Sequence, residues 1–132
     1  MTTAEFSIST AKRTQFVSIT SKVAEVITTK GWQDGVLTIF VPHTTAGVTI
    51  NENADPDVAR DMEMFSDQLV PQSNRFRHSE GNSDAHIKAS FYGSSVQVIV
   101  RNGRIWLGIW QGIYFCEFDG PRERNVYLGF MD

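Results

Sequence analysis

The stretch SVQVIVRNGRIWLGI, residues 95–109, decides the fold class. Apolar residues recur at every second position over 96–100, as in a strand that buries one face. Asn102 and Gly103 follow, and an Asn-Gly pair between two alternating runs is the strongest short-range signal for a β-hairpin. Alternation resumes over 105–109. The stretch therefore predicts two adjacent antiparallel strands.

Further strands and helices are predicted on both sides of this hairpin. The strand-like runs are 5–9, 14–19, 35–41, 47–51, 113–118 and 126–130. The run 35–41 is almost continuously apolar, which indicates a strand buried on both faces. Three helices are predicted: one capped by Thr20 or Ser21 that runs to Lys30, one from an N-cap at Asp55 to a stop at Pro71, and one capped by Ser83 or Asp84 that runs through 89–92.

The last third of the chain is typical of an antiparallel meander, and the helices are inserted between blocks of strands. This order predicts an α+β fold with a largely antiparallel β-sheet core and two to three helices packed on it. A chain of 132 residues suits one domain, so residues 1–132 are expected to form a single compact unit. In the middle helix an apolar stripe is formed by Val58, Met62, Phe65 and Leu69.

Composition excludes several classes of function. The formal net charge of −3 argues against nucleic acid or an anionic membrane as a partner, because both require a basic surface. The single Cys116 rules out an intrachain disulfide and a cysteine-based zinc site. No run approaches the roughly 20 apolar residues of a membrane-spanning helix, and residues 1–6 lack the features of a signal peptide. We therefore expect a protein of a reducing cytoplasm.

The chain contains three histidines, and each lies at the boundary of a predicted element. His43 follows the apolar strand, His78 lies in the polar loop 71–83, and His86 lies in the first turn of the next helix. Three imidazoles around one divalent metal, with a fourth position open to water, form a common catalytic arrangement. The alternative is three unrelated surface or hydrogen-bonded histidines, because the spacing contains no short-range metal motif.

Carboxylates gather over residues 51–57 (NENADPD), between a predicted strand and a predicted helix. Glu52 has no obvious cap or ion pair to form, which favours a role as general base or as a ligand of a hard cation. Asp55 has a simpler alternative as the N-cap of the helix. Asn51, at the end of the same predicted strand, could contact a substrate.

Residues 117–124 (EFDGPRER) place Arg122 and Arg124 around a Gly-Pro turn. A guanidinium binds phosphate or carboxylate through two parallel hydrogen bonds, so this pair suits an anionic ligand. The alternative is a set of surface ion pairs with neighbouring carboxylates, each worth roughly 0–1 kcal/mol. Thr44 and Thr45, which follow His43, supply hydroxyls that could also contact a phosphate.

Four segments match the pattern of a known family: 43–58 (HTTAGVTINENADPDV), 78–86 (HSEGNSDAH), 107–113 (LGIWQGI) and 117–122 (EFDGPR). Taken together they resemble the secondary thiamine-phosphate synthase family, also called the YjbQ family, over about residues 5–131. The resemblance implies a homotrimer in which His43, His78 and His86 hold a divalent metal, with zinc expected. It also implies that the same pocket is lined or supported by Glu52, Asp55, Gln111, Glu117 and Arg122.

The resemblance further implies a weak thiamine-phosphate synthase activity, which joins a pyrimidine diphosphate to a thiazole phosphate. In that reaction Arg122 and Arg124 would bind phosphate, and magnesium could accompany the diphosphate. The same residues also suit metal-dependent hydrolysis with Glu52 as general base on a metal-bound water. A third reading is a trimeric protein that binds a metal or a small phosphorylated metabolite without turning it over.

Overall fold

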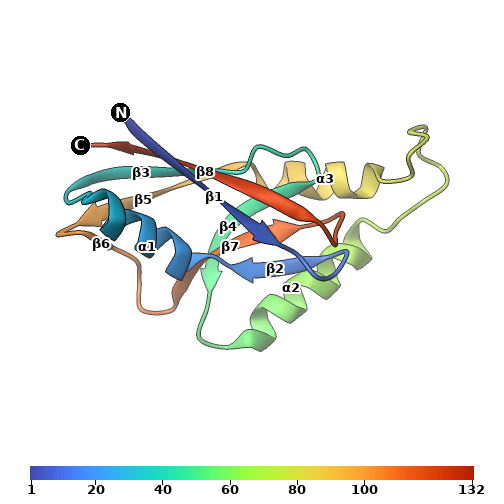
Figure 1. Cartoon of the computed structure of the whole chain (residues 1–132). Helices are drawn as coiled ribbons and strands as arrows, with labels where there is room; N and C mark the ends of the chain where they lie inside the picture. The colour runs from blue at the N-terminus through green and yellow to red at the C-terminus, as the bar shows by residue number, and fades with distance from the viewer.

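The computed structural model describes residues 1–132, which form eight strands and three helices (Figure 1). In chain order the elements are β1 (Thr2–Ser9), β2 (Gln15–Ser18), α1 (Thr20–Lys30), β3 (Gly35–Phe40), β4 (Ala46–Glu52), α2 (Pro56–Leu69), α3 (Ser83–Tyr92), β5 (Ser95–Arg101), β6 (Arg104–Ile105), β7 (Gln111–Glu117) and β8 (Glu123–Met131). None of the three helices is long and apolar enough to cross a membrane.

The strands form two antiparallel sheets. One sheet has the order β1-β8-β3-β5-β6, and the other has the order β2-β7-β4. The predicted α+β class with an antiparallel core is confirmed, and so is the hairpin, in which Asn102 (φ 52°) and Gly103 (φ 74°) both adopt positive φ. The predicted meander is wrong, because β7 and β8 are consecutive along the chain but belong to different sheets.

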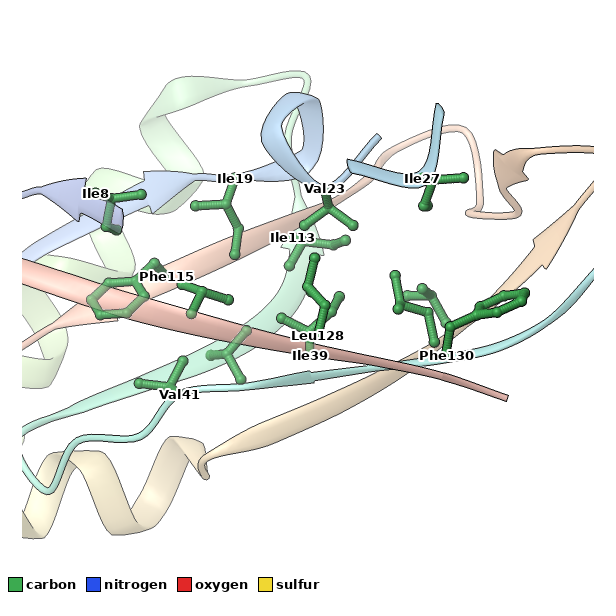
Figure 2. Packing of buried hydrophobic residues seen from close by; sticks show 14 of the residues in the cluster. Ile8, Ile19, Val23, Ile27, Ile39, Val41, Ile113, Phe115, Leu128 and Phe130 are labelled. Carbon is green, nitrogen blue, oxygen red and sulfur yellow. The ribbon is translucent and has the colours of Figure 1, made fainter. Parts of the chain in front are cut away.

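The main core lies between the two sheets and beneath α1. Val23 and Ile27 are four residues apart on α1 and fully buried, so one face of this helix closes the core. Figure 2 shows Val23 directed toward Ile113 of β7 and Leu128 of β8. Burying each such aliphatic side chain contributes about 1.5–3 kcal/mol, so this cluster accounts for much of the stability of the fold.

The central strand β3 is buried on one face only, which corrects the expectation of burial on both. Leu37 and Ile39 point into the core, whereas the opposite face of the five-stranded sheet stays exposed. The register places the exposed apolar side chains of three strands side by side on that face. This outer apolar face consists of Val36, Phe40, Ile99, Tyr127 and Met131.

Three further expectations need correction. The return strand β6 ends at Ile105, and residues 106–110 form a loop with Trp106, Ile109 and Trp110 exposed. The apolar stripe of α2 is only partly covered, because Phe65 and Leu69 near its end remain exposed. The expected N-cap of α2 is confirmed: the side chain of Asp55 accepts a hydrogen bond from the backbone N–H of Asp57 at 2.9 Å. The caps expected for the other two helices are wrong, because neither α1 nor α3 has a side-chain cap; the Thr20 hydroxyl instead accepts from the Ile113 backbone N–H at 2.9 Å.

Candidate functional site

A buried ion pair joins the end of β7 to the start of β8. Glu117 is fully buried, and the side chain of Arg124 is 3% exposed. Arg124 donates from Nε to Oε1 of Glu117 at 2.8 Å and from a second nitrogen to Oε2. The Thr10 hydroxyl donates to Oε1 at 2.8 Å, and the backbone N–H of Asp119 donates to Oε2 at 3.0 Å. Both carboxylate oxygens are therefore fully engaged inside the protein.

The same network also uses Thr45. Arg124 donates to the Thr45 hydroxyl at 2.8 Å and to its carbonyl oxygen at 3.3 Å. Burial alone would raise the pKa of Glu117, but hydrogen bonds from Arg124, Asp119 and Thr10 outweigh it and hold that pKa below 4.5. Glu117, Arg124 and Thr45 thus join the two sheets through buried hydrogen bonds.

His43 lies next to this network, beyond the end of β3. Its side chain bonds to the backbone of β8 where a further residue of β3 would otherwise pair. β3 ends at Phe40, opposite Tyr127, and the imidazole Nε2 of His43 accepts a hydrogen bond from the backbone N–H of Asn125 at 2.9 Å. Burial and the nearby Arg124 guanidinium lower the pKa of His43 below its ordinary value of 6.5. The neutral ring therefore carries its proton on Nδ1, which leaves a donor and no free lone pair.

An open cavity of about 500 Å³ lies between the β3–β4 loop and one face of α3. We call it the α3 cavity; its lining residues are His43, Thr44, Ala46, His86, Ala89, Ser90, Gly93 and Ser94. The helix contributes residues three or four apart, so they share one face. Gly47 allows the close approach of β4 to the end of α3, because a Cβ atom at Gly47 would lie 2.6 Å from the Gly93 carbonyl oxygen.

The three histidines do not form a metal centre within the chain. His78 and His86 lie edge to face with their ring centroids 5.6 Å apart, and His86 shares the α3 cavity with His43. No group of three or more His, Cys, Asp or Glu side chains is arranged to hold a metal ion. The physical reason at His43 is that its one available lone pair is committed to Asn125. The expected three-histidine metal pocket is therefore wrong for this chain.

Arg122 remains more open than Arg124. Its side chain is 48% exposed and donates to the carbonyl oxygen of Asp119 at 2.9 Å and to the Asp119 carboxylate at 3.0 Å. It is close enough to His43 to contribute to the lowered pKa of that imidazole. Of the two arginines predicted to bind phosphate, only Arg122 is accessible beside the α3 cavity.

Glu52 and Asn51 lie at the end of β4 that is far from the α3 cavity. The seven residues of β4 rise by about 3.3 Å each, so Glu52 lies roughly 20 Å from the Ala46 end. Glu52 accepts hydrogen bonds from the backbone N–H groups of Ala54 and Asp55, at 3.0 and 3.3 Å, and so closes the turn into α2. Asn51 lies beside Glu52, and its side-chain oxygen accepts from the Glu52 backbone N–H at 2.7 Å.

Gln111 also lies at the Glu52 end of β4, far from the α3 cavity. It is the register partner of Glu52, and its side-chain oxygen accepts a hydrogen bond from the Gly108 backbone N–H at 2.8 Å. The structure therefore separates the predicted site residues into two groups. Within one chain, Glu52, Asp55 and Gln111 do not meet the three histidines.

A charged network that the sequence analysis did not anticipate holds α3 in place. The buried Asp84 accepts from Arg13 at 2.9 Å and from Lys88 at 3.1 Å. Lys88 also donates to Asp67 of α2 at 2.7 Å. Asp84 and Lys88 are four residues apart on α3, a spacing that places them on one face, but their partners Arg13 and Asp67 are distant in sequence. Ser90 and Ser94 of the α3 cavity were also missed, because isolated serines carry no local signal.

Comparison with known proteins places this geometry in a family. A family model described as "UPF0047 protein YjbQ-like" matches residues 4–132. The chain belongs to the YjbQ/UPF0047 family. Among its relatives, UPF0047 protein YugU of Bacillus subtilis is 52% identical over 94% of this chain and 95% of that protein. UPF0047 protein MJ1081 of Methanocaldococcus jannaschii is 50% identical over 94% of this chain and 90% of that protein.

Solved structures of similar proteins share the fold. A protein of the YjbQ/UPF0047 family from Clostridium acetobutylicum is 52% identical, with a TM-score of 0.93 over 97% of this chain and 99% of that one. A hypothetical protein from Aeropyrum pernix is 39% identical, with a TM-score of 0.93 over 99% and 98% of the two chains.

These findings correct the expected activity. The matching relatives are described only as UPF0047 proteins, and none of these descriptions assigns a reaction. Together with the missing three-histidine centre, this overturns the expectation of a thiamine-phosphate synthase-type transferase. The alternatives that depended on that metal centre, hydrolysis by a metal-bound water and storage of a metal, lose their basis for the same reason.

Proposed function

We propose that the α3 cavity binds a small phosphorylated molecule. One observation carries the proposal: the cavity is lined by two imidazoles and three hydroxyls, and none of its eight lining residues is acidic. Phosphate oxygens accept hydrogen bonds and carry negative charge, so a cavity rich in donors and free of carboxylates suits them. The exposed guanidinium of Arg122 near His43 adds positive charge at the same side.

Several donors in the cavity are available to such a ligand. Because Nε2 of His43 accepts from Asn125, the Nδ1–H of the neutral ring is free to donate. The hydroxyls of Thr44 and Ser94 form no hydrogen bond within the chain, whereas that of Ser90 donates to the His86 carbonyl oxygen at 3.0 Å. A phosphate group would therefore bind through His43, Thr44 and Ser94, with Arg122 adding long-range attraction.

A homotrimer is part of the same proposal. The outer apolar face presents two rows of exposed apolar side chains of the kind that subunit interfaces cover: Val36 beside Ile99 and Met131, and Phe40 beside Tyr127. Closed cyclic assembly would bury this face in every copy and leave none exposed. Light scattering after size exclusion should give a mass near three chains, and a monomer at micromolar concentration would contradict it.

A divalent cation would bind together with the phosphate. Magnesium keeps several waters and binds mainly through phosphate oxygens, so it needs no group of three protein ligands. Zinc would have only the imidazoles of His78 and His86 from this chain. Titration with each metal in the presence of pyrophosphate checks this, and His78→Ala should weaken a zinc effect while leaving a magnesium effect unchanged.

The central test is calorimetric titration with inorganic phosphate and pyrophosphate. Thr44→Val removes one cavity donor, and a hydrogen bond to a charged group is worth about a tenfold change in affinity. Thr3→Val makes the same chemical change on exposed β1 and should leave the affinity unchanged. Equal affinity of the two variants, or no heat from either ligand with the unmodified protein, would overturn the proposal.

A further inference from the structure

A second, apolar pocket of about 280 Å³ lies between α2 and the opposite face of α3. We call it the α2–α3 pocket; five of its seven lining residues are hydrophobic, and Phe65, Leu69 and Phe91 form its exposed part. It lies across α3 from the α3 cavity, because positions 88, 91 and 92 of the helix point away from positions 86, 89, 90 and 93. The two sites are therefore separate.

A buried cation lines this pocket. The side chain of Lys88 is 3% exposed, and its ammonium donates to Asp67 at 2.7 Å and to Asp84 at 3.1 Å. An ammonium group has three N–H donors, so one of them has no acceptor within the chain. A buried donor without a partner is costly, and an oxygen atom of a bound molecule would satisfy it.

The hydroxyl of Tyr92 can accept a hydrogen bond in the same pocket. The Ser66 hydroxyl donates its single proton to the Met62 carbonyl oxygen at 2.6 Å, so the Tyr92 hydroxyl, 2.7 Å from Ser66, must donate to Ser66. The oxygen of Tyr92 keeps its capacity to accept. Lys88 and Tyr92 are four residues apart on α3, which makes their side chains neighbours on one face.

The charge around Lys88 selects against an anionic ligand. Its ammonium already faces two carboxylates, and Arg13, the other cation of this network, is itself paired with Asp84 at 2.9 Å. A ligand carboxylate would bring a third negative group to one ammonium. A hydroxyl group is uncharged, accepts one hydrogen bond and donates another, which matches the free donor of Lys88 and the free acceptor of Tyr92.

We propose that the α2–α3 pocket is a binding site for a small uncharged alcohol or phenol. The apolar body of the ligand packs against Phe65, Leu69 and Phe91, while its hydroxyl accepts from Lys88 and donates to Tyr92. A pocket of this size suits a single ring or a short branched chain.

Fluorine NMR with 4-fluorophenol tests the proposal, and fluorobenzene serves as the matched probe without a hydroxyl. We expect saturable line broadening of 4-fluorophenol with a Kd on the order of 1 mM, as for a ligand of few atoms. Fluorobenzene should bind about fivefold more weakly, since it lacks the hydrogen bonds. Equal affinity of the two probes would overturn the assignment to hydroxyl compounds, and the absence of saturable binding would overturn the site itself.

Two variants locate the binding. Leu69→Trp fills the pocket from a side chain that is 61% exposed, so the fold should persist and 4-fluorophenol binding should be lost. Ile109→Trp is the matched control, because Ile109 is 88% exposed on the distant 106–110 loop. Both variants should bind inorganic phosphate as the unmodified protein does, which keeps this test independent of the α3 cavity. Unchanged 4-fluorophenol binding in Leu69→Trp would place the probe elsewhere and refute the proposal.

Discussion

The carboxylate of Glu117 and the guanidinium of Arg124 form a buried ion pair seven residues apart, on either side of the turn between β7 and β8. β7 belongs to the three-stranded sheet and β8 to the five-stranded sheet, so this pair fastens the two sheets together. Thr10 and Thr45 complete its hydrogen bonds. This buried polar cluster is therefore a structural junction next to the α3 cavity.

Glu117→Gln should lower the free energy of unfolding by about 3–5 kcal/mol, because it leaves the Arg124 charge buried without a partner. Urea unfolding followed by circular dichroism measures this. Glu123→Gln is the matched control at an exposed position and should change stability by less than about 0.5 kcal/mol. The double variant Glu117→Gln with Arg124→Met should cost less than the two single changes added together. A loss below about 1 kcal/mol in Glu117→Gln would contradict the role assigned to the pair.

Stability should also depend on pH through His43. Burial and Arg124 lower its pKa in the folded protein below 6.5, so the unfolded chain takes up the proton first as the pH falls. The free energy of unfolding should therefore decrease as the pH drops below 6.5, until the folded state is also protonated. His43→Gln keeps an acceptor for the Asn125 N–H and should flatten this decrease, whereas His78→Gln should retain it. An unchanged slope in His43→Gln would show that another group is responsible.

The role of Asp55 can be separated from catalysis. Asp55→Ala should cost about 1 kcal/mol of stability through loss of the N-cap of α2. Asp55→Ser should restore most of that stability, because serine also caps helices. Neither change should alter phosphate affinity, since Asp55 follows the far end of β4 from the α3 cavity. Weaker phosphate binding with unchanged stability would show instead that Asp55 acts on the ligand.

Gly47→Ala should destabilise the protein by about 1–3 kcal/mol and disturb the α3 cavity. The added methyl group would lie 2.6 Å from the Gly93 carbonyl oxygen, which is backbone and cannot rotate away. Gly108→Ala is the matched control, because its nearest neighbour, at 3.2 Å, is the flexible side chain of Gln111. Thermal unfolding and phosphate titration of the two variants measure both effects. Equal melting temperatures would mean that β4 and α3 separate easily.

Much of the fold was predictable because its signals are local. Asn102 and Gly103 specify a turn with positive φ at both residues, and Asp55 caps the helix that begins at Pro56. The alternation of apolar residues located most strands to within a few positions. Sheet membership was not predictable, because the pairing of β8 with β1 and β3 joins segments that are far apart in the chain.

The candidate site was harder to predict for the same reason. Glu117 was expected to line or support a pocket, and it lies in an unbroken buried stretch of β7, where a carboxylate needs an internal partner. The commitment of His43 to the backbone of Asn125 depends on a contact 82 residues away in sequence. Glu52 ends β4 and His43 precedes its start, so the strand predicted over 47–51 already implied their separation.

The hydrogen bond between His43 and Asn125 has a spectroscopic consequence. An amide proton that points at an imidazole nitrogen responds to the electronic state of the ring, so the Asn125 resonance acts as an intrinsic sensor. Any event at His43, whether titration or contact with a solute, should move this one peak in a nitrogen–proton correlation spectrum without a label being attached.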